Sequence, residues 1–334
     1  GGGSIAHIDN AGALKVGPES AGANPGPVAY NLGNQQPVVT DANLVLGRIN
    51  PHYVLGGRLK IDAQLSRAAM KKQIADPMGL SVEAAAQGVI SVVNSNMARA
   101  IRVITVEKGH NPSDFALVAY GGAGPLHAVH LAQEMGIRTV LIPPAPGALC
   151  ALGLLTADIK KCYVKTSLIP YDQATPQQIN QAVLALMEEG NQWLASENVP
   201  EQRRKFHNVA EMRYVGQNYE LQVEIPSGAI TQSDLVQMKE DFFRAHEMNY
   251  GYYNPNAPVQ FVNFRSEAIG EVQKPTLAEL TETMEEPSGA VIEYRDVYFE
   301  ETGIVRCPVY DRSKFGRCPR VNGPCIVEQM DSTT

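Results

Sequence analysis

The chain has 334 residues, of which 44% are hydrophobic and 19% charged, and its formal net charge is −7. This composition is typical of globular proteins, and the length is sufficient for two domains. The negative charge argues against nonspecific binding to nucleic acid or to anionic membranes, and no apolar run reaches the length of a membrane span. Five cysteines without closely spaced pairs predict reduced thiols in a cytoplasmic protein.

The first 60 residues are rich in glycine and proline. Gly1–Ser4 offers backbone donors that could cradle a phosphate or an oxyanion, with a flexible end as the alternative. Val16–Pro27 excludes a regular helix or a central strand and predicts an ordered, extended loop. Asp9 and Asp41 each have two possible roles. Asp9 suits a turn and Asp41 suits a helix cap. Alternatively, their carboxylates could serve a magnesium–nucleotide site.

A long helix is predicted from a cap at Ser81 to about Lys108, because apolar residues recur there at helical spacing. The next segment, Phe115–Pro144, has the pattern of strand, glycine turn, helix and strand. Phe115–Ala119 predicts a strand that is buried on both faces, and three glycines follow within five residues. In open α/β sheets ligands bind at such a turn, and a helix that begins there favours an anion.

Histidines and cysteines give no defined site. His127 and His130 lie three residues apart on the helix after the turn, but further metal ligands are not evident nearby, so packed histidines are the better interpretation. Cys150 has apolar flanks that predict a buried, inert thiol. Cys307, Cys318 and Cys325 have a spacing that fits no common zinc site and are interpreted as structural.

A second domain is predicted to follow a boundary within Ser167–Pro176. Periodicity predicts helices over 177–198 and 233–249, strands over 210–225 and 258–272, and antiparallel β structure over 290–327. The predicted fold class is α/β for residues 1–168, followed by an α+β domain with antiparallel strands over residues 169–334.

Several blocks resemble the hydantoinase A/oxoprolinase family in order along nearly the whole chain. They are Gly1–Tyr30, TDANLVLGR at Thr40–Arg48, Met97–Ala128, Pro143–Ile159, MRYVGQNYELQV at Met212–Val223 and HEMNYGY at His246–Tyr252. GGAGPLHA within the third block is similar to the adenosine motif of the actin, hexokinase and chaperone ATPase superfamily.

This resemblance implies that residues 1–168 are the C-terminal part of an actin-like, ribonuclease H-like ATP-binding core. It implies that Gly121, Gly122, Ala123 and Gly124 contact the nucleotide, and it makes Asn94 and Arg99 candidates from the preceding helix. The implied cofactors are ATP and Mg²⁺, with another divalent metal in the partner as an option. The implied partners are a hydantoinase B-type subunit or domain, an upstream part of the same ATPase core and a small cyclic amide.

The sequence departs from the family pattern at three places. The two upstream phosphate-binding motifs are not present and the chain starts without methionine, so an internal or C-terminal fragment that is inactive by itself is expected. NLGNQQ at Asn31–Gln36 replaces a glycine-rich loop, and Cys150 replaces a serine.

The function expected from this resemblance is ATP-dependent ring opening of a hydantoin, 5-oxoproline or a lactam through a phosphorylated substrate. The alternatives are the ATP-binding subunit of an acetone- or acetophenone-type carboxylase and a non-catalytic nucleotide-binding scaffold. The residue pattern does not assign catalytic residues or a metal site.

Overall fold

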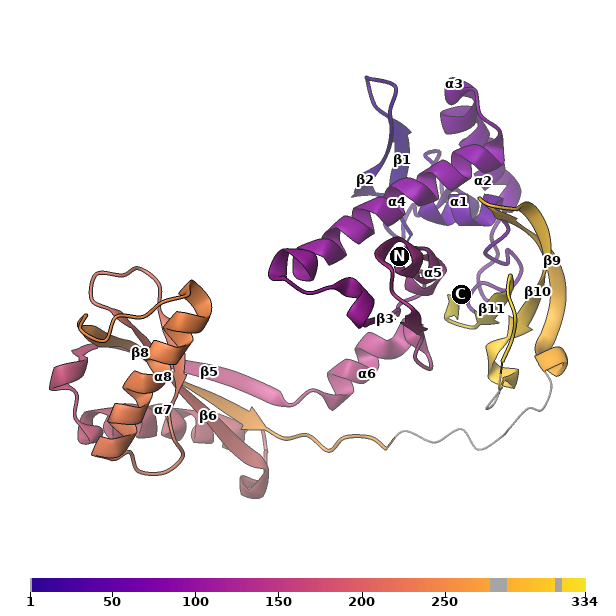
Figure 1. The fold of residues 1–334 in the computed structure, drawn as a ribbon. Helices are drawn as coiled ribbons and strands as arrows, with labels where there is room; N and C mark the ends of the chain where they lie inside the picture. Colours follow the sequence, from indigo (N-terminus) through magenta and orange to yellow (C-terminus); the bar gives the residue numbers. More distant parts are fainter. Residues whose placement is uncertain (1, 277–286, 316–319) are drawn as a thin grey trace. The chain divides into compact units, whose positions relative to one another are not determined.

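The computed structural model describes residues 2–276, 287–315 and 320–334, so Gly1 and Cys318 lie outside the described residues. The chain divides into two compact units, residues 1–153 with 277–334 and residues 154–276 (Figure 1). The described part of the C-terminal segment therefore belongs with the N-terminal unit. The predicted domain boundary at 168/169 divides the chain into two consecutive segments, whereas the two units are defined by contacts and one of them is discontinuous. The boundary therefore remains a prediction.

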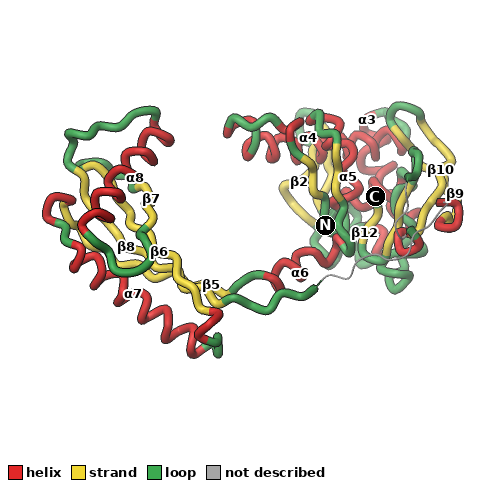
Figure 2. The backbone as a smooth tube through the Cα atoms, turned by 60° about the horizontal axis from the view of Figure 1, so that its bottom comes forward, coloured by secondary structure: helices red, strands yellow, loops and turns green. Residues whose placement is uncertain are grey.

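Unit 1 combines a helical layer with three small sheets (Figure 2). Its elements are β1 (Ser4–Ile8), β2 (Leu14–Ser20), α1 (Val39–Val45), α2 (Ala63–Met70), α3 (Asp76–Met78), α4 (Val82–Ile104), β3 (Ala116–Val118), α5 (Gly124–Met135), β4 (Thr139–Leu141), α6 (Leu149–Thr156), β9 (Val291–Phe299), β10 (Gly303–Asp311), β11 (Ile326–Gln329) and β12 (Ser332–Thr333). Helix α6 extends across the division between the units. Strand β2 includes the first residues of Val16–Pro27, which were predicted to form an extended loop. It pairs with β1 in a two-stranded hairpin and is therefore not a central strand.

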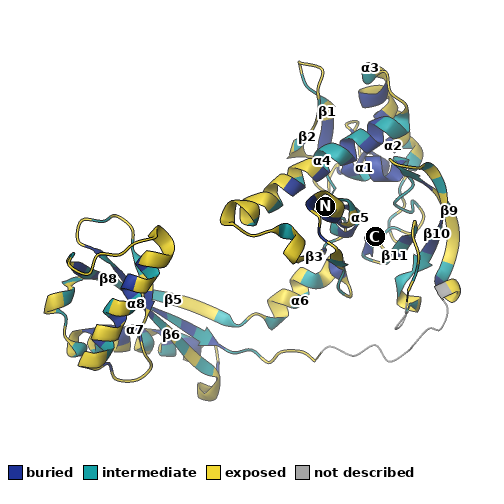
Figure 3. Cartoon of the chain, viewed as in Figure 1, coloured by how far each residue is buried: buried dark blue, intermediate teal, exposed yellow. Residues whose placement is uncertain are grey.

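The core of unit 1 lies between α1, α2, α4 and the β1–β2 hairpin. Helix α4 begins as predicted, with the Ser81 side chain accepting a hydrogen bond from the Ala84 amide at 3.1 Å. Residues 82–108 form a helix that is long and apolar enough to cross a membrane, by length and composition only. A core helix can have the same length and composition. Ala85, Ala86 and Val89 in the first half of α4 are fully buried against the other helices, whereas Val103 and Ile104 at its end are exposed. Helix α4 is accordingly buried at one end and exposed at the other (Figure 3).

The sheet of β9 to β12 is fastened to the helical layer by main-chain contacts. The Tyr298 amide in β9 donates to the Leu46 carbonyl after α1 at 2.9 Å. Strands β9 and β10 are antiparallel, as are β11 and β12, but β10 and β11 are parallel. The prediction of antiparallel structure over 290–327 is thus right except at this one pairing.

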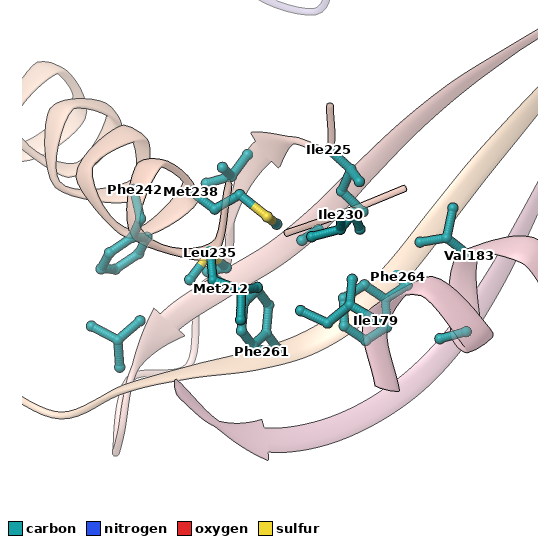
Figure 4. Close-up of a cluster of buried hydrophobic side chains, with 14 of the residues drawn as sticks. Ile179, Val183, Met212, Ile225, Ile230, Leu235, Met238, Phe242, Phe261 and Phe264 are labelled. Atoms are coloured by element: carbon teal, nitrogen blue, oxygen red, sulfur yellow. The ribbon is translucent and has the colours of Figure 1, made fainter. Parts of the chain in front are cut away.

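Unit 2 is a two-layer structure with one four-stranded antiparallel sheet in the order β5-β8-β6-β7. It contains β5 (Ile159–Pro170), α7 (Pro176–Ser196), β6 (Arg204–Tyr214), β7 (Leu221–Glu224), α8 (Gln232–Tyr250) and β8 (Val259–Gly270). Both helices begin with a capping box, at Thr175 and Thr231. Their apolar faces cover the same sheet face, where Phe242, Phe261 and Phe264 are fully buried (Figure 4).

Candidate functional site

The strand–turn–helix–strand unit predicted around the glycine turn is present. Strands β3 and β4 pair in parallel, with Leu117 opposite Val140, and the turn follows the carboxyl end of β3. Gly121 has a φ of +81°, which L side chains rarely adopt, and its amide donates to the Pro146 carbonyl at 2.7 Å. Pro125 is in the first turn of α5, and Gly136 ends that helix in the left-handed conformation.

A cavity of about 260 Å³ lies against this turn. Gly122, Ala123 and Leu126 form one side of it, and residues 328–333 together with residues 49–61 form much of the rest. Its polar lining comes from Tyr30, Thr40, Asn50, Glu328, Asp331 and Ser332, and its apolar lining includes Leu55, Leu59 and Ile61. The lining thus combines an apolar surface with polar groups that could orient a small molecule.

Glu328 in the cavity wall is a buried carboxylate, with only 3% of its side chain exposed. It pairs with Arg295 of β9, whose Nη2 lies 2.7 Å from Glu328 Oε1. The Asn50 amide is a further neighbour, at 3.4 Å from Oε2. The charge is therefore neutralised within the wall, and Glu328 is fixed in place by two elements far apart in sequence.

Tyr30 is placed in the cavity by a buried carboxylate behind it. Asp41 is fully buried, and its Oδ atoms accept from the amides of Val28 and Ala29 at 3.0 Å and of Val38 at 2.9 Å. Burial raises the pKa of Tyr30, and the negative charge of Asp41 raises it further. The phenol consequently stays protonated at neutral pH and can donate a hydrogen bond.

The Asp41 geometry confirms helix capping, since its bond to the Val38 amide is at the start of α1. Ser66 of α2 donates to the same carboxylate at 2.5 Å. Asp9 is confirmed as a turn residue, because its Oδ1 accepts from the amides of Ala11 and Ala13 at 2.9 Å. Both acids are thus occupied by backbone donors.

His127 is buried at 4% exposure on α5, and its Nδ1 lies 2.7 Å from Oδ1 of Asn94 on α4. The amide oxygen only accepts, so Nδ1 is assigned the proton. Burial lowers the pKa of His127 to about 4, and the charges of Arg48 and His130 contribute in the same direction. At neutral pH the ring is uncharged and joins α5 to α4.

The candidate nucleotide residues are distributed over three places. Gly122 and Ala123 line the cavity, with Gly121 and Gly124 in the same turn. Asn94 lies on α4, and its side chain contacts His127 of α5. Arg99 instead lines a separate depression between α4 and the β1–β2 hairpin, together with Lys15 and Ser95. Their roles in nucleotide binding remain predictions.

Several cavity residues carry no local sequence signal, namely Tyr30, Asn50, Glu328, Asp331 and Ser332. Tyr30 and Asn50 lie about 280 to 300 residues before Glu328, Asp331 and Ser332 in the sequence, and only the fold brings the two groups together. The prediction that the Cys150 thiol is buried is wrong, because Cys150 is exposed. It lies on the apolar helix α6, none of whose residues is buried in this chain. Within the described ranges, no group of three or more His, Cys, Asp or Glu side chains could hold a metal ion.

These features define an α/β unit with a cavity at a glycine turn. The family described as hydantoinase/oxoprolinase matches residues 1–163, and its C-terminal domain matches residues 171–334. The chain belongs to the hydantoinase/oxoprolinase family, as its sequence blocks predict.

Similar proteins support this assignment. The chain is 38% identical to caprolactamase subunit alpha of Pseudomonas jessenii, over 98% of this chain and 48% of that subunit. The crystal structure of ATP-dependent caprolactamase from the same organism covers the whole chain at a TM-score of 0.80 and 37% identity, with 49% of that structure matched. A nucleotide-free structure of acetone carboxylase also covers the whole chain, at a TM-score of 0.83, 29% identity and 49% of its own length.

The chain thus spans about half the length of the curated relatives it matches first. The likeness to these solved structures confirms the predicted fold class, a mixed α/β actin-like core with antiparallel sheets. The family includes both ATP-dependent amide hydrolases and ketone carboxylase subunits.

Proposed function

We propose that this chain is part of the ATP-binding subunit or domain of an enzyme that opens a cyclic amide in an ATP-dependent reaction. The observation that carries the proposal is the cavity at the glycine turn, in a chain that is 38% identical to a caprolactamase subunit. The substrate class is a hydantoin, 5-oxoproline or a lactam. By itself the chain is expected to be inactive, because it spans about half of such a subunit.

The residues of the cavity suit part of a nucleotide. Gly122 and Ala123 of the turn line the cavity, and since Gly122 has no side chain, a ligand can approach its backbone closely. Leu55, Leu59 and Ile61 offer an apolar surface for a base, and Tyr30 and Thr40 offer hydroxyl groups for a sugar. When bound, ATP supplies the phosphoryl group that turns an amide oxygen into a better leaving group.

The described residues do not fit a resident magnesium site. Asp331 and Glu328 are the carboxylates of the cavity, and both already accept hydrogen bonds from the protein. Magnesium commonly enters such sites on the substrate phosphates with only one or two carboxylates. We propose Mg²⁺ as a companion of the nucleotide and derive no step from it.

The β3–β4 sheet carries exposed apolar side chains, which supports the proposal that further polypeptide packs against it. Phe115 next to β3, Val118 in β3 and Leu141 in β4 are 51%, 47% and 54% exposed, although this strand pattern predicts burial on both faces. We propose that an upstream part of the same ATPase core covers this sheet, and that a hydantoinase B-type subunit or domain completes the enzyme in the cytoplasm. The caprolactamase relative is named as a subunit.

A ketone carboxylase subunit is the second candidate function. The observation in its favour is the acetone carboxylase structure, which matches the whole chain with a TM-score of 0.83, against 0.80 for caprolactamase. These two values do not separate the branches, whereas the higher identity to caprolactamase, 37% against 29%, favours the amide hydrolase.

The test is ADP release by the complete subunit with its natural partner in the presence of magnesium and ATP. The substrates are N-methylhydantoin, 5-oxoproline, a simple lactam, and a ketone with bicarbonate. Stimulation by a cyclic amide supports the proposal, and stimulation by ketone and bicarbonate alone moves the chain to the carboxylase branch. Nucleotide binding without stimulation by any of these substrates would contradict the proposal and favour the scaffold.

A further inference from the structure

Residues 329–332 lie against the two loops that follow the carboxyl ends of β3 and β4. The Ser332 hydroxyl is 3.3 Å from the Gly122 carbonyl and 3.5 Å from the Gly121 carbonyl. Asp331 Oδ2 accepts from the Gly147 amide at 2.8 Å. Residues 121–124 and 145–148, here called the two cavity loops, are thus held from one side by the same short segment.

The contact between Asp331 and Gly147 explains why a glycine stands in the second loop. A Cβ on Gly147 would lie 2.8 Å from Asp331 Oδ2 and 2.9 Å from its Cβ and carbonyl oxygen, which is closer than such atoms approach. Gly147 does not have the positive φ that also favours glycine. The constraint is therefore the close approach of Asp331, because any side chain would displace it.

A line of polar contacts connects Asp331 to the sheet behind it. Gln329 Nε2 donates to Asp331 Oδ1, and Gln329 Oε1 accepts from Arg312 Nη1 at 2.9 Å. Arg312 Nη2 donates to the Ile142 carbonyl, directly after β4, at 2.6 Å. The contacts run from Ile142 through three side chains to Gly147, so they connect the second cavity loop to the chain just after β4.

We propose that Asp331 is a positioning residue that sets the shape of the ligand cavity by holding the second cavity loop, while the neighbouring Ser332 contacts the first. The cavity is then a composite, because the family match that contains Asp331 begins at residue 171, whereas the glycine turn lies in the match to residues 1–163. That the cavity takes a nucleotide rests on the proposed function. The positioning of the loops is independent of which ligand binds.

The test measures peptide-level hydrogen exchange and Mg-ADP affinity in the complete subunit with its partner. Asp331→Ala removes the acceptor for the Gly147 amide, and exchange in the peptide covering 144–149 should rise about tenfold or more. Exchange in the peptide covering 119–126 should rise less, through the bond of the Gly121 amide to the Pro146 carbonyl in the second loop. Mg-ADP affinity should fall several-fold. Asp331→Asn keeps one acceptor oxygen for the Gly147 amide but loses the acceptor for Gln329 Nε2, so it should restore both values in part.

Two further variants control the experiment. Gly147→Ala displaces Asp331 from the other side and should give the same local rise in exchange. Asp114→Ala removes an exposed carboxylate at the opposite end of β3 and should change neither loop.

The outcomes separate this inference from the proposed function. Unchanged exchange in both loop peptides of Asp331→Ala would overturn the inference, and so would a rise that extends equally to α7. Faster loop exchange with no Mg-ADP binding in any variant would support the positioning role and contradict the nucleotide assignment.

Discussion

Protonation of His127 should make acid destabilise unit 1. The folded pKa of about 4 lies below the ordinary value of 6.5, mainly because burial disfavours the charged ring. Above pH 6.5 both states are neutral, so this histidine has no effect on the pH dependence. As the pH falls through 6.5, the unfolded chain binds a proton that the folded chain does not bind until about pH 4.

The size of the effect follows from these two values. At about 1.4 kcal/mol for each pH unit of difference, the full loss amounts to about 3 kcal/mol, and the loss at pH 5 is about 2 kcal/mol. Marginal stabilities of ~5–15 kcal/mol make this loss measurable.

The assay is urea unfolding followed by far-UV circular dichroism at pH 7.5 and pH 5. His127→Asn retains a donor for Asn94 Oδ1 but does not titrate, so its free energy of unfolding should change about 2 kcal/mol less between the two pH values than that of the natural chain. His52→Gln, at an exposed position, should retain the natural pH dependence. Equal pH dependence of His127→Asn and the natural chain would refute this account.

Three further substitutions test packing and buried charge. Asp41→Ala leaves three amides and the Ser66 hydroxyl without their acceptor and should lower the free energy of unfolding by about 3–5 kcal/mol in urea titrations, whereas a loss below about 1 kcal/mol would contradict the role of this carboxylate. Gly190→Ala places a Cβ 2.7 Å from that of Ala268 and should destabilise unit 2 by about 1–3 kcal/mol. Unfolding is followed by the fluorescence of the single tryptophan, Trp193. Gly153→Ala is the control, because a Cβ at that position would meet no atom within 4 Å. Arg295→Met leaves Glu328 buried and unpaired and should cost about 3–5 kcal/mol by thermal unfolding, and adding Glu328→Gln should restore part of it; no restoration would refute the pairing.

Local structure was predictable wherever one short segment carries its own signal. Ser81 caps α4 and Gly136 ends α5 as predicted, since a side-chain oxygen and a missing Cβ act within a few residues. The prediction of a strand buried on both faces was only half fulfilled. Ala116–Val118 forms the strand, but in this chain Val118 is exposed and Leu117 is only partly buried, because periodicity indicates a need for burial without naming the partner.

The sequence by itself determined the glycine turn, the helices around it and the family, because these depend on residues that are neighbours along the chain. Only the tertiary structure decided that Asp331, Ser332 and Glu328 close the cavity, and that Arg99 lies away from it while Asn94 contacts α5. The pairing of Asp331 with Gly147 spans 184 residues. No local pattern encodes such a contact, since it depends on how β9 to β12 fold back onto the loops after β3 and β4.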